Sequence, residues 1–385
     1  MILLLISLLL LLPYAVLIIS YRQSWLKAES YQPENRNQNT TLITVVIPAR
    51  NEEKNIGHCI ESILLQTYPI QLFEVIIVDD NSIDSTSAIV NSFTQKNISL
   101  IKLSDFAGNE NLNSYKKKAI ETAISLATGN LIVTTDADCI VQPEWLKTIA
   151  SYYENTGSVF IAAPVVYADV LPDDSELKKF FKIFQSLDFM ALQGITGASV
   201  YKKIHNMCNG ANLAYEKKTF YEVNGFEGID NIASGDDMLL MHKIQKKYPD
   251  KIRYLKSTNV IVQTQQSETI KEFINQRIRW ASKADRYPDF KITVVLILVY
   301  CLNAWIVFIA VYCFFYPKAF YLFLLLFAVK ITVELFFLFP VVKFFRKQKL
   351  LWWFISSQPF HIIYILIAGW LGKFGSYTWK ERKVK

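Results

Sequence analysis

Long apolar segments at both ends of this 385-residue chain place the strongest limit on how it can fold. Residues 1–20 contain no charged side chain and are long enough to cross the roughly 30 Å hydrocarbon layer of a bilayer. Two more apolar segments lie near 292–316 and 319–342. They predict a membrane protein, in agreement with a charged-residue content of 19%, below the roughly 25% of soluble domains.

The residues that flank the first apolar segment predict its orientation. The segment lacks the positive N-terminal region and the small-residue cleavage site of a signal peptide, so we interpret residues 1–21 as a membrane anchor. Arg22 and Lys27 are the first cations to follow it. Because cations accumulate on the cytoplasmic side, the chain after the anchor is expected in the cytoplasm. The protein as a whole is expected to be a multi-pass protein of the plasma membrane.

The C-terminal segment 286–372 leaves its own topology open. Residues 350–372 are apolar but are interrupted by Gln358-Pro359, so they either cross the bilayer or lie at its surface. The side of the membrane on which the basic tail 373–385 ends depends on that choice.

Two features inside the helical patterns each have two interpretations. Lys330 and Glu334 stand one helical turn apart, which favours an ion pair facing other helices over a proton relay. An amphipathic segment runs from Asp174 to Met190. It is expected to be a helix packed on the sheet, with a helix at the membrane surface as the alternative.

Between the apolar ends, after a polar linker at 22–40, residues 41–285 predict one cytoplasmic α/β domain. Short β-branched runs alternate with helix-like patterns such as Ile56, Ile60 and Ile63. The expected strands cover 42–47, 73–78, 98–103, 131–135 and 159–165. Strands that alternate with helices predict a mostly parallel, doubly wound sheet.

The sequence argues against several function classes. The five cysteines form no CxxC pair and the four histidines form no HExxH motif, which disfavours zinc sites and a disulfide framework. No GxGxxG follows the first expected strand, so the dinucleotide fingerprint is absent. The net charge of +7 agrees with basic residues beside a membrane, and without an aromatic-basic RNA motif no nucleic-acid partner is expected.

Acidic residues follow three of the expected strands. Asn51-Glu52-Glu53 follow the first, Asp79-Asp80 end the second, and Asp136-Ala137-Asp138 end the fourth. Ligands of open α/β sheets bind beyond the carboxyl ends of the strands, so these side chains are expected to converge. Gathered carboxylates repel one another unless a hard cation such as Mg²⁺ or Mn²⁺ joins them to a diphosphate. Asp136 and Asp138 suit that role if the chain turns at Ala137, although a lone DxD is also common in solvated loops.

Two further clusters are ambiguous when each is taken alone. Gly235-Asp236-Asp237 precede an apolar helical run, where an aspartate can act as a general base or as a helix cap. Gln276-Arg-Ile-Arg279-Trp280 can clamp a phosphate and cover a cleft, or anchor the chain at a membrane interface.

Taken together and in this order, the motifs resemble the family 2 glycosyltransferases, which have the GT-A (Rossmann-like) nucleotide-sugar-binding fold. The resemblance covers about residues 41–285 and the membrane flanks. It is carried by Val46-Ile-Pro-Ala-Arg-Asn-Glu52, Val78-Asp-Asp-Asn-Ser82, Thr135-Asp-Ala-Asp138, Gly235-Asp-Asp and Gln276-x-x-Arg279-Trp280. It implies an inverting, metal-dependent hexosyltransferase that uses a nucleotide-diphosphate sugar and Mg²⁺ or Mn²⁺.

The resemblance also implies a role for each matching residue. Asp237 would be the catalytic base, and Asp138, with Asp136, would bind the metal. Donor-binding residues would be Pro48, Asn51, Glu52, Asp79, Asp80, Lys116, Asp136, Gln276, Arg279 and Trp280; acceptor-binding residues would be Asn209, Gly210, Asp236 and Trp280. The sequence departs from the family pattern at Tyr115, where relatives have glycine, and at Asp236, where many relatives have glutamate.

The acceptor and the mode of transfer remain open at this stage. Anchorage at both ends favours a lipid or lipid-linked glycan acceptor held close to the bilayer. The Gln-x-x-Arg-Trp motif favours a processive polysaccharide synthase, whereas only three or four spans favour a single transfer, which we prefer. A sugar nucleotidyltransferase would need a glycine- and arginine-rich phosphate loop, which is not visible in the sequence. A non-catalytic scaffold would not need every acidic position, yet all of them are present. Donor nucleotide, sugar and oligomeric state are not predicted.

Overall fold

The computed structural model describes residues 1–33, 40–107, 114–171, 173–204, 206–232, 234–283, 289–375, 377–379 and 382–384. They form two compact units. The sheet unit comprises Glu29–Ala168 and Asn206–Gln265. The helical unit comprises Met1–Ala28, Asp169–His205 and Gln266–Lys385. The predicted single domain at 41–285 is thus divided between the two units, and its boundaries stay a prediction.

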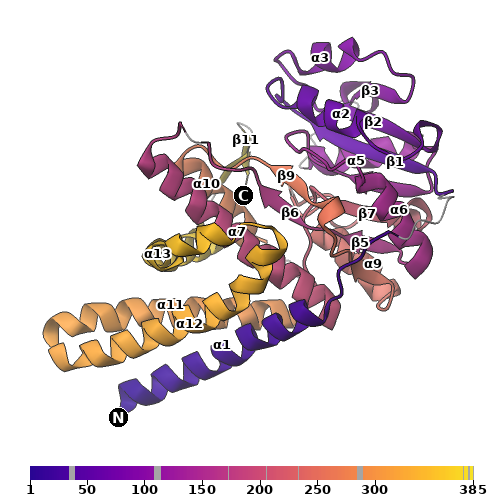
Figure 1. The fold of residues 1–385 in the computed structure, drawn as a ribbon. Helices are drawn as coiled ribbons and strands as arrows, with labels where there is room; N and C mark the ends of the chain where they lie inside the picture. Colours follow the sequence, from indigo (N-terminus) through magenta and orange to yellow (C-terminus); the bar gives the residue numbers. More distant parts are fainter. Residues whose placement is uncertain are drawn as a thin grey trace. The chain divides into compact units, whose positions relative to one another are not determined.

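The sheet unit contains every strand of the large sheet (Figure 1). Its strands are β1 (Ile43–Ala49), β2 (Phe73–Asp79), β3 (Ile98–Lys102), β4 (Leu131–Thr134), β5 (Phe160–Ala162), β6 (Val165–Tyr167), β7 (Leu213–Glu216), β8 (Ile252–Tyr254) and β9 (Val262–Thr264). Its helices are α2 (Ile56–Leu64), η1 (Ile70–Leu72), α3 (Thr86–Ser92), α4 (Ser104–Ala107), α5 (Tyr115–Leu126), α6 (Trp145–Thr156), α8 (Lys217–Glu222), α9 (Met238–Lys247) and η2 (Thr258–Val260).

The large sheet is mixed, with strand order β3-β2-β1-β4-β7-β5-β8. Strands β1 to β4 pair in parallel, and α5 packs against β1 and β2. The residues of β1, β2 and β4 are nearly all buried, as expected for strands covered on both faces.

The expectation of a mostly parallel sheet is confirmed, with the exception of β7, which runs antiparallel to both β4 and β5. The chain enters β7 beside the carboxyl end of β4, where Thr134 lies opposite Leu213, so β7 must run in the opposite direction. This reversal places residues 209–212 at the same edge of the sheet as the end of β4.

The first four predicted strands are confirmed to within two residues at each end. The fifth, predicted at 159–165, is wrong as a single strand. It divides into β5 in the large sheet and β6, which pairs in parallel with β9 in a separate sheet. Pro164 lies between the two strands and has no backbone N–H to continue a ladder, which accounts for the break.

The helical unit contains α1 (Ile2–Lys27), α7 (Glu176–Lys202), α10 (Ile270–Ala281), α11 (Phe290–Phe315), η4 (Pro317–Ala319), α12 (Phe320–Phe344), η5 (Gln348–Trp353), α13 (Phe354–Phe374), β10 (Tyr377–Trp379) and β11 (Arg382–Val384). Among the described residues, four helices are long and apolar enough to cross a membrane, by length and composition: Ile2–Lys27, Phe290–Phe315, Pro317–Phe344 and Gln348–Phe374. Helix α1 extends beyond the predicted end at residue 21, so Arg22 and Lys27 are helical. Of the predicted tail, Lys380 and Lys385 lie outside the described residues.

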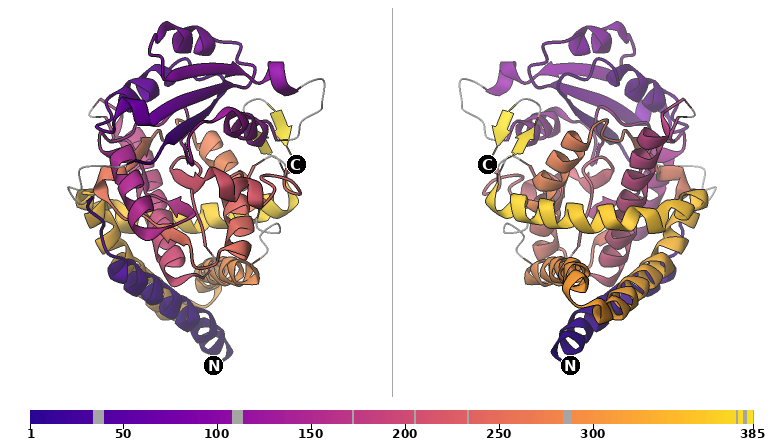
Figure 2. Two further views of the ribbon diagram at one scale, coloured as in Figure 1. Left: turned by 90° about the vertical axis from the view of Figure 1, so that its right-hand side faces the viewer. Right: turned by 90° about the vertical axis from the view of Figure 1, so that its left-hand side faces the viewer.

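Helix α7 corrects the interpretation of the amphipathic segment. It begins after the cap Ser175 and packs against α1, α12 and α13 within the helical unit. We had expected it to pack on the sheet. Gly194 explains the close approach to α12, because a Cβ at this position would lie 2.6 Å from a methyl group of Val341. Figure 2 shows α1 and α12 side by side in the same unit.

The predicted ion pair between Lys330 and Glu334 is confirmed, with 2.7 Å between Nζ and Oε1. Gln358 of α13 joins both groups: its Oε1 accepts from Lys330 at 2.6 Å, and its Nε2 donates to Glu334 at 2.9 Å. The Tyr14 hydroxyl of α1 also donates to Glu334. The pair therefore ties three apolar helices together.

Replacing Lys330 with methionine is expected to destabilise the protein by about 3–5 kcal/mol, because it leaves Glu334 buried without its cation. The double variant Lys330→Met/Glu334→Gln removes both charges and is expected to recover most of that loss. Thermal unfolding in detergent micelles measures both effects. An unchanged midpoint for Lys330→Met would show that the buried pair contributes little.

Candidate active site

The loops after β1 and β2 hold each other through predicted donor residues. Asn51 has a φ of +53°, a conformation that asparagine tolerates better than most residues. Its N–H donates to the Ser82 hydroxyl and its side-chain oxygen accepts from the N–H of Ile83, both at 3.0 Å. Asp79 accepts from the N–H of Ser82 at 3.0 Å and from the Ser87 hydroxyl. Asn51 and Asp79 therefore shape the edge of the site, and their donor-binding roles stay predictions.

Asp80 lies at the same edge, with its backbone N–H bonded to the carbonyl of Ala49 at the end of β1. It is buried, and Arg50 stands 3.6 Å from its carboxylate and donates to its carbonyl oxygen at 2.9 Å. Pro48 lies past the last pair of the β1–β4 ladder, Val46 with Thr134, so its missing N–H disturbs no bond there. The donor roles of Asp80 and Pro48 stay predictions.

The Asp136-Ala137-Asp138 segment makes a sharp turn, which was the condition for its metal role, and the N–H of Cys139 closes it on the carbonyl of Asp136 at 3.1 Å. One oxygen of Asp138 accepts from the Thr264 hydroxyl at 3.1 Å and the other lies 3.5 Å from the Cys139 sulfur. Burial, reinforced by the negative charges of Asp136 and Glu52, raises the pKa of Asp138 to about 6. Glu52, Asp136 and Asp138 are therefore neighbours at the carboxyl ends of β1 and β4.

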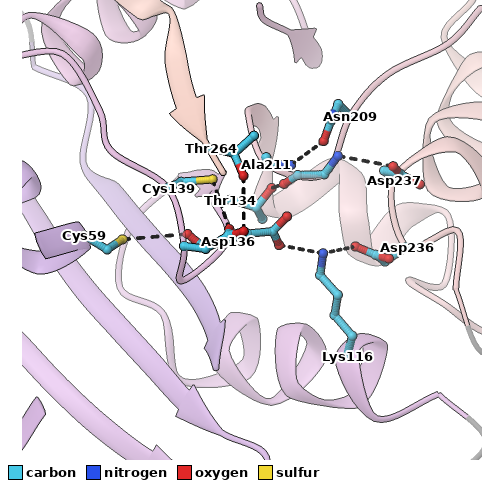
Figure 3. Close-up of polar contacts among 12 residues, drawn as sticks. Cys59, Lys116, Thr134, Asp136, Cys139, Asn209, Ala211, Asp236, Asp237 and Thr264 are labelled. Carbon is cyan, nitrogen blue, oxygen red and sulfur yellow. Dashed lines mark hydrogen bonds and ion pairs between the residues drawn. The ribbon is translucent and has the colours of Figure 1, made fainter. Parts of the chain in front are cut away.

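Lys116, at the start of α5, joins two acidic segments that are far apart in the sequence. Its Nζ lies 2.7 Å from Asp136 and 3.2 Å from Asp236, and Figure 3 shows it between the two carboxylates. Burial would lower the pKa of Lys116, but the charges of Asp136, Asp236 and Asp237 outweigh it and raise that pKa above its ordinary range. The side chain is thus a permanent cation that connects the Asp136 turn to the Asp236-Asp237 pair.

Asp237 caps the N-terminus of α9 and also contacts the chain that leads into β7. One oxygen accepts from the N–H of Met238 at 2.7 Å and the other from the N–H of Gly210 at 3.2 Å. A side chain at Gly210 would crowd this contact, since a Cβ would lie 3.2 Å from an Asp236 oxygen. The Thr134 hydroxyl holds the Gly210 carbonyl at 3.2 Å. The helix cap is confirmed, and the role as base stays a prediction.

The neighbouring residue of that chain segment is also ordered by a local bond. The side-chain oxygen of Asn209 accepts from the N–H of Ala211 at 3.0 Å (Figure 3). Asn209 and Gly210 therefore lie beside the Asp236-Asp237 pair, as expected of acceptor-side residues, although their binding role stays a prediction.

The remaining predicted residues, Gln276, Arg279 and Trp280, lie on α10 in the helical unit. Arg277, which lies within the motif, orders two of them: it donates to Gln276 at 2.9 Å, and its guanidinium carbon lies 4.2 Å from the centre of the Trp280 ring. Asp188 of α7 holds Arg277 at 2.6 Å. The donor and acceptor roles of the three residues stay predictions.

Three residues that order the predicted site residues were not predicted from the sequence: Arg50, Thr264 and Arg277. Arg50 and Arg277 lie inside quoted motifs, where a cation among predicted site residues was the available signal. Thr264 ends β9, and the β-branched run that precedes it indicates a strand. What Thr264 contacts depends on the pairing of β9 with β6, which no local pattern specifies.

The residues at the Asp136 turn fit a divalent metal. Among the described residues, no group of three or more histidine, cysteine or acidic side chains is arranged around one point. Asp136 and Asp138 supply hard oxygen ligands, and Mg²⁺ characteristically takes one or two carboxylates and fills its other positions with water and phosphate. The raised pKa of Asp138 reflects burial and a repulsion that such a cation would relieve.

The comparisons with known proteins agree with this geometry. Residues 44–222 match the sequence profile described as Glycosyl transferase family 2. This part of the chain belongs to that family. The match includes the loops after β1 and β2, Lys116, the Asp136 turn and Gly210, whereas Asp236-Asp237 lie beyond its end.

Several curated glycosyltransferases are similar to parts of this chain. Glycosyltransferase AglE of Haloferax volcanii is 30% identical over 126 residues, covering 33% of this chain and 40% of the relative. Probable glycosyltransferase YdaM of Bacillus subtilis is 27% identical over 259 residues, covering 65% and 56%. The 4,4'-diaponeurosporenoate glycosyltransferase of Staphylococcus aureus is 26% identical over 171 residues, covering 44% and 40%. The alignments thus span about 40–56% of the lengths of these relatives.

A solved structure has the same fold. It is the mannosyltransferase PcManGT of Pyrobaculum calidifontis in complex with GDP-Man and Mn²⁺, with a TM-score of 0.56 and 18% identity over 96% of both chains. The predicted GT-A fold, accompanied by apolar helices, is therefore confirmed.

Proposed function

We propose that this chain is an inverting glycosyltransferase that moves a hexose from a nucleotide-diphosphate sugar to a lipid or lipid-linked acceptor. The observation that carries the proposal is the arrangement around Lys116. Its ammonium lies between Asp136, at the end of β4, and Asp236, which precedes the capping residue Asp237. In this proposal the Asp136 turn belongs to the donor subsite and the Asp236-Asp237 pair to the acceptor subsite, and the contacts of Lys116 with both support it.

In this proposal Asp237 is the general base. Two backbone N–H groups orient its carboxylate, and each oxygen keeps a second lone pair that can accept the acceptor hydroxyl proton. As the proton moves to Asp237, the hydroxyl oxygen bonds to the anomeric carbon of the sugar. The bond from that carbon to the diphosphate oxygen breaks, and its electron pair leaves with the nucleoside diphosphate. One displacement of this kind inverts the anomeric configuration.

The donor subsite would be the Asp136 turn. Asp138, with Asp136, would hold Mg²⁺ or Mn²⁺, which supplies positive charge for the departing diphosphate. Thr264 fixes the orientation of Asp138, and Lys116 balances the charge of Asp136. PcManGT, which has the same fold, is described with GDP-Man and Mn²⁺, which supports testing nucleotide sugars together with that ion.

The acceptor side is proposed to lie at the cytoplasmic membrane surface. Trp25 of α1 and Phe344 of α12 pack edge to face at 5.5 Å, so these helices end at the same level of the helical unit. The cations at both ends, Arg22 and Lys27 after the first apolar segment and Arg346 to Lys349 after the third, therefore lie on one side. The Staphylococcus aureus relative is named for a single defined acceptor, which supports single transfer over a processive polymer synthase.

A donor panel tests this function. Membranes containing the protein are incubated with UDP-, GDP- and TDP-sugars, with Mg²⁺, Mn²⁺ or a chelator, and both nucleotide release and lipid-extractable sugar are measured. We expect one nucleotide sugar to yield nucleoside diphosphate and a glycolipid of fixed size only when the metal is present. A long polymer would support the processive synthase, and release of pyrophosphate would identify a nucleotidyltransferase.

A further inference from the structure

The segment between α8 and α9, residues 223–237, carries Asp236 and Asp237 and contains no helix or strand among its described residues. A buried side chain from outside the segment binds three of its carbonyl groups. The Nζ of Lys117 on α5 donates to the carbonyl oxygens of Ile229 at 2.6 Å, Ile232 at 2.7 Å and Ser234 at 3.0 Å. Lys117 is only 2% exposed.

This arrangement uses the full bonding capacity of the lysine. An ammonium group has three N–H donors, and three carbonyl oxygens meet them here. Burying a charged group without such partners costs free energy. The ammonium is therefore held where the three carbonyls meet it, and the carbonyls are held at the ammonium. The backbone at Ile229, Ile232 and Ser234 is therefore held by a side chain that belongs to another element.

Lys117 directly follows Lys116, and the two side chains hold successive parts of the same segment. Lys117 binds the backbone up to Ser234, and Lys116 binds the carboxylate of Asp236 two residues later. The start of α5 thus fixes the path of the chain immediately before Asp237.

We propose that Lys117 is a positioning residue for the transfer reaction: it holds the backbone at Ile229, Ile232 and Ser234 so that Asp237 meets Gly210 and faces the acceptor. The inference rests on the proposed function, in which Asp237 is the base. Lys117 itself touches neither substrate, so its loss acts through the placement of Asp237.

The chain offers a matched control in Lys243 of α9. Its Nζ also donates to three carbonyls of the same segment, those of Asn224 at 3.3 Å, Gly225 at 2.7 Å and Glu227 at 2.8 Å. The bond type is the same, but these carbonyls lie at the opposite end of the segment from Asp237. If substituting either lysine lowers activity, the loss reflects general destabilisation. If only the substitution of Lys117 lowers activity, the loss reflects positioning.

The test compares Lys117→Met with Lys243→Met in the full chain. We expect Lys117→Met to lower kcat by about 10–100-fold, because small misplacements of a reacting group have effects of that size, while KM for the donor changes little. Lys243→Met should keep a kcat close to that of the unmodified chain at a similar loss of thermal stability. Equal effects of the two substitutions on kcat, or an unchanged kcat in Lys117→Met, would overturn the proposal.

Hydrogen–deuterium exchange provides a readout that does not depend on activity. Amides of residues 229–238 should exchange faster in Lys117→Met than in Lys243→Met. An absence of this difference would also overturn the positioning role. If the unmodified protein transfers no sugar from any nucleotide donor, the proposed function fails, and the exchange experiment still decides whether Lys117 holds the segment.

Discussion

Replacing Asp237 with asparagine is expected to lower the transfer rate by about 10²–10⁴-fold, the range typical of a lost general base. Asparagine has the same shape and keeps one carbonyl oxygen for the N–H of Met238 or Gly210, so the cap of α9 is weakened but not removed. Affinity for the nucleotide sugar should remain, since the proposed donor subsite lies at the Asp136 turn. Initial rates and equilibrium donor binding, measured on the same preparation, check both parts.

Asp236→Asn is the control for the asparagine substitution at 237. It changes the neighbouring carboxylate, which pairs with Lys116 at 3.2 Å, but leaves the proposed base intact. Its effect on the rate should be clearly smaller. A fully active Asp237→Asn variant would remove this residue from the role of base.

The second large effect is expected at the metal subsite. Asp138→Asn replaces a charged ligand with a neutral one and should reduce Mn²⁺-dependent donor binding by about 10²-fold or more, since metal stabilisation of a phosphate group is worth several kcal/mol. Titration of the nucleotide sugar with and without Mn²⁺ measures the loss. Donor affinity that still increases with Mn²⁺ in this variant would exclude Asp138 as the metal ligand.

Thr264→Val offers a graded comparison at the same subsite. It removes the hydroxyl that donates to Asp138 at 3.1 Å but leaves the carboxylate. Substitutions of such supporting groups typically lower metal affinity by about 10–100-fold. Thr264→Val should therefore fall between the unmodified chain and Asp138→Asn in its requirement for Mn²⁺.

Features with a local cause could be predicted from the sequence. The strands β1 to β4 are short β-branched runs between turn residues, and the edge where they end follows from their parallel order. The ion pair of Lys330 with Glu334 depends on residues four positions apart, so spacing alone was sufficient.

Features that depend on distant pairing could not be predicted in this way. The direction of β7 is decided by where the chain returns to the sheet after α7, and the sequence of Leu213–Glu216 does not contain that information. Lys116, Lys117 and Lys118 are identical in type, yet Lys116 binds carboxylates and Lys117 binds carbonyls. Only the orientation of α5 on the sheet distinguishes them.

The partners of α7 were missed for a related reason. Its apolar residues fit a sheet, a membrane surface or other helices equally well, and periodicity does not identify which surface covers them. Gly194 carried the relevant signal, since a small residue in an amphipathic helix permits close packing against another helix.

We propose that the Asp136 turn, Lys116 and the Asp236-Asp237 pair form one nucleotide-sugar site. It is tested most directly by an experimental structure of the full chain with a nucleoside diphosphate and Mn²⁺, in which anomalous scattering locates the manganese. We expect manganese bound to the carboxylate of Asp138 and to diphosphate oxygens, with Lys116 and Asp237 at the same edge of the sheet. Manganese and nucleotide bound away from Asp136 and Asp138 would contradict it.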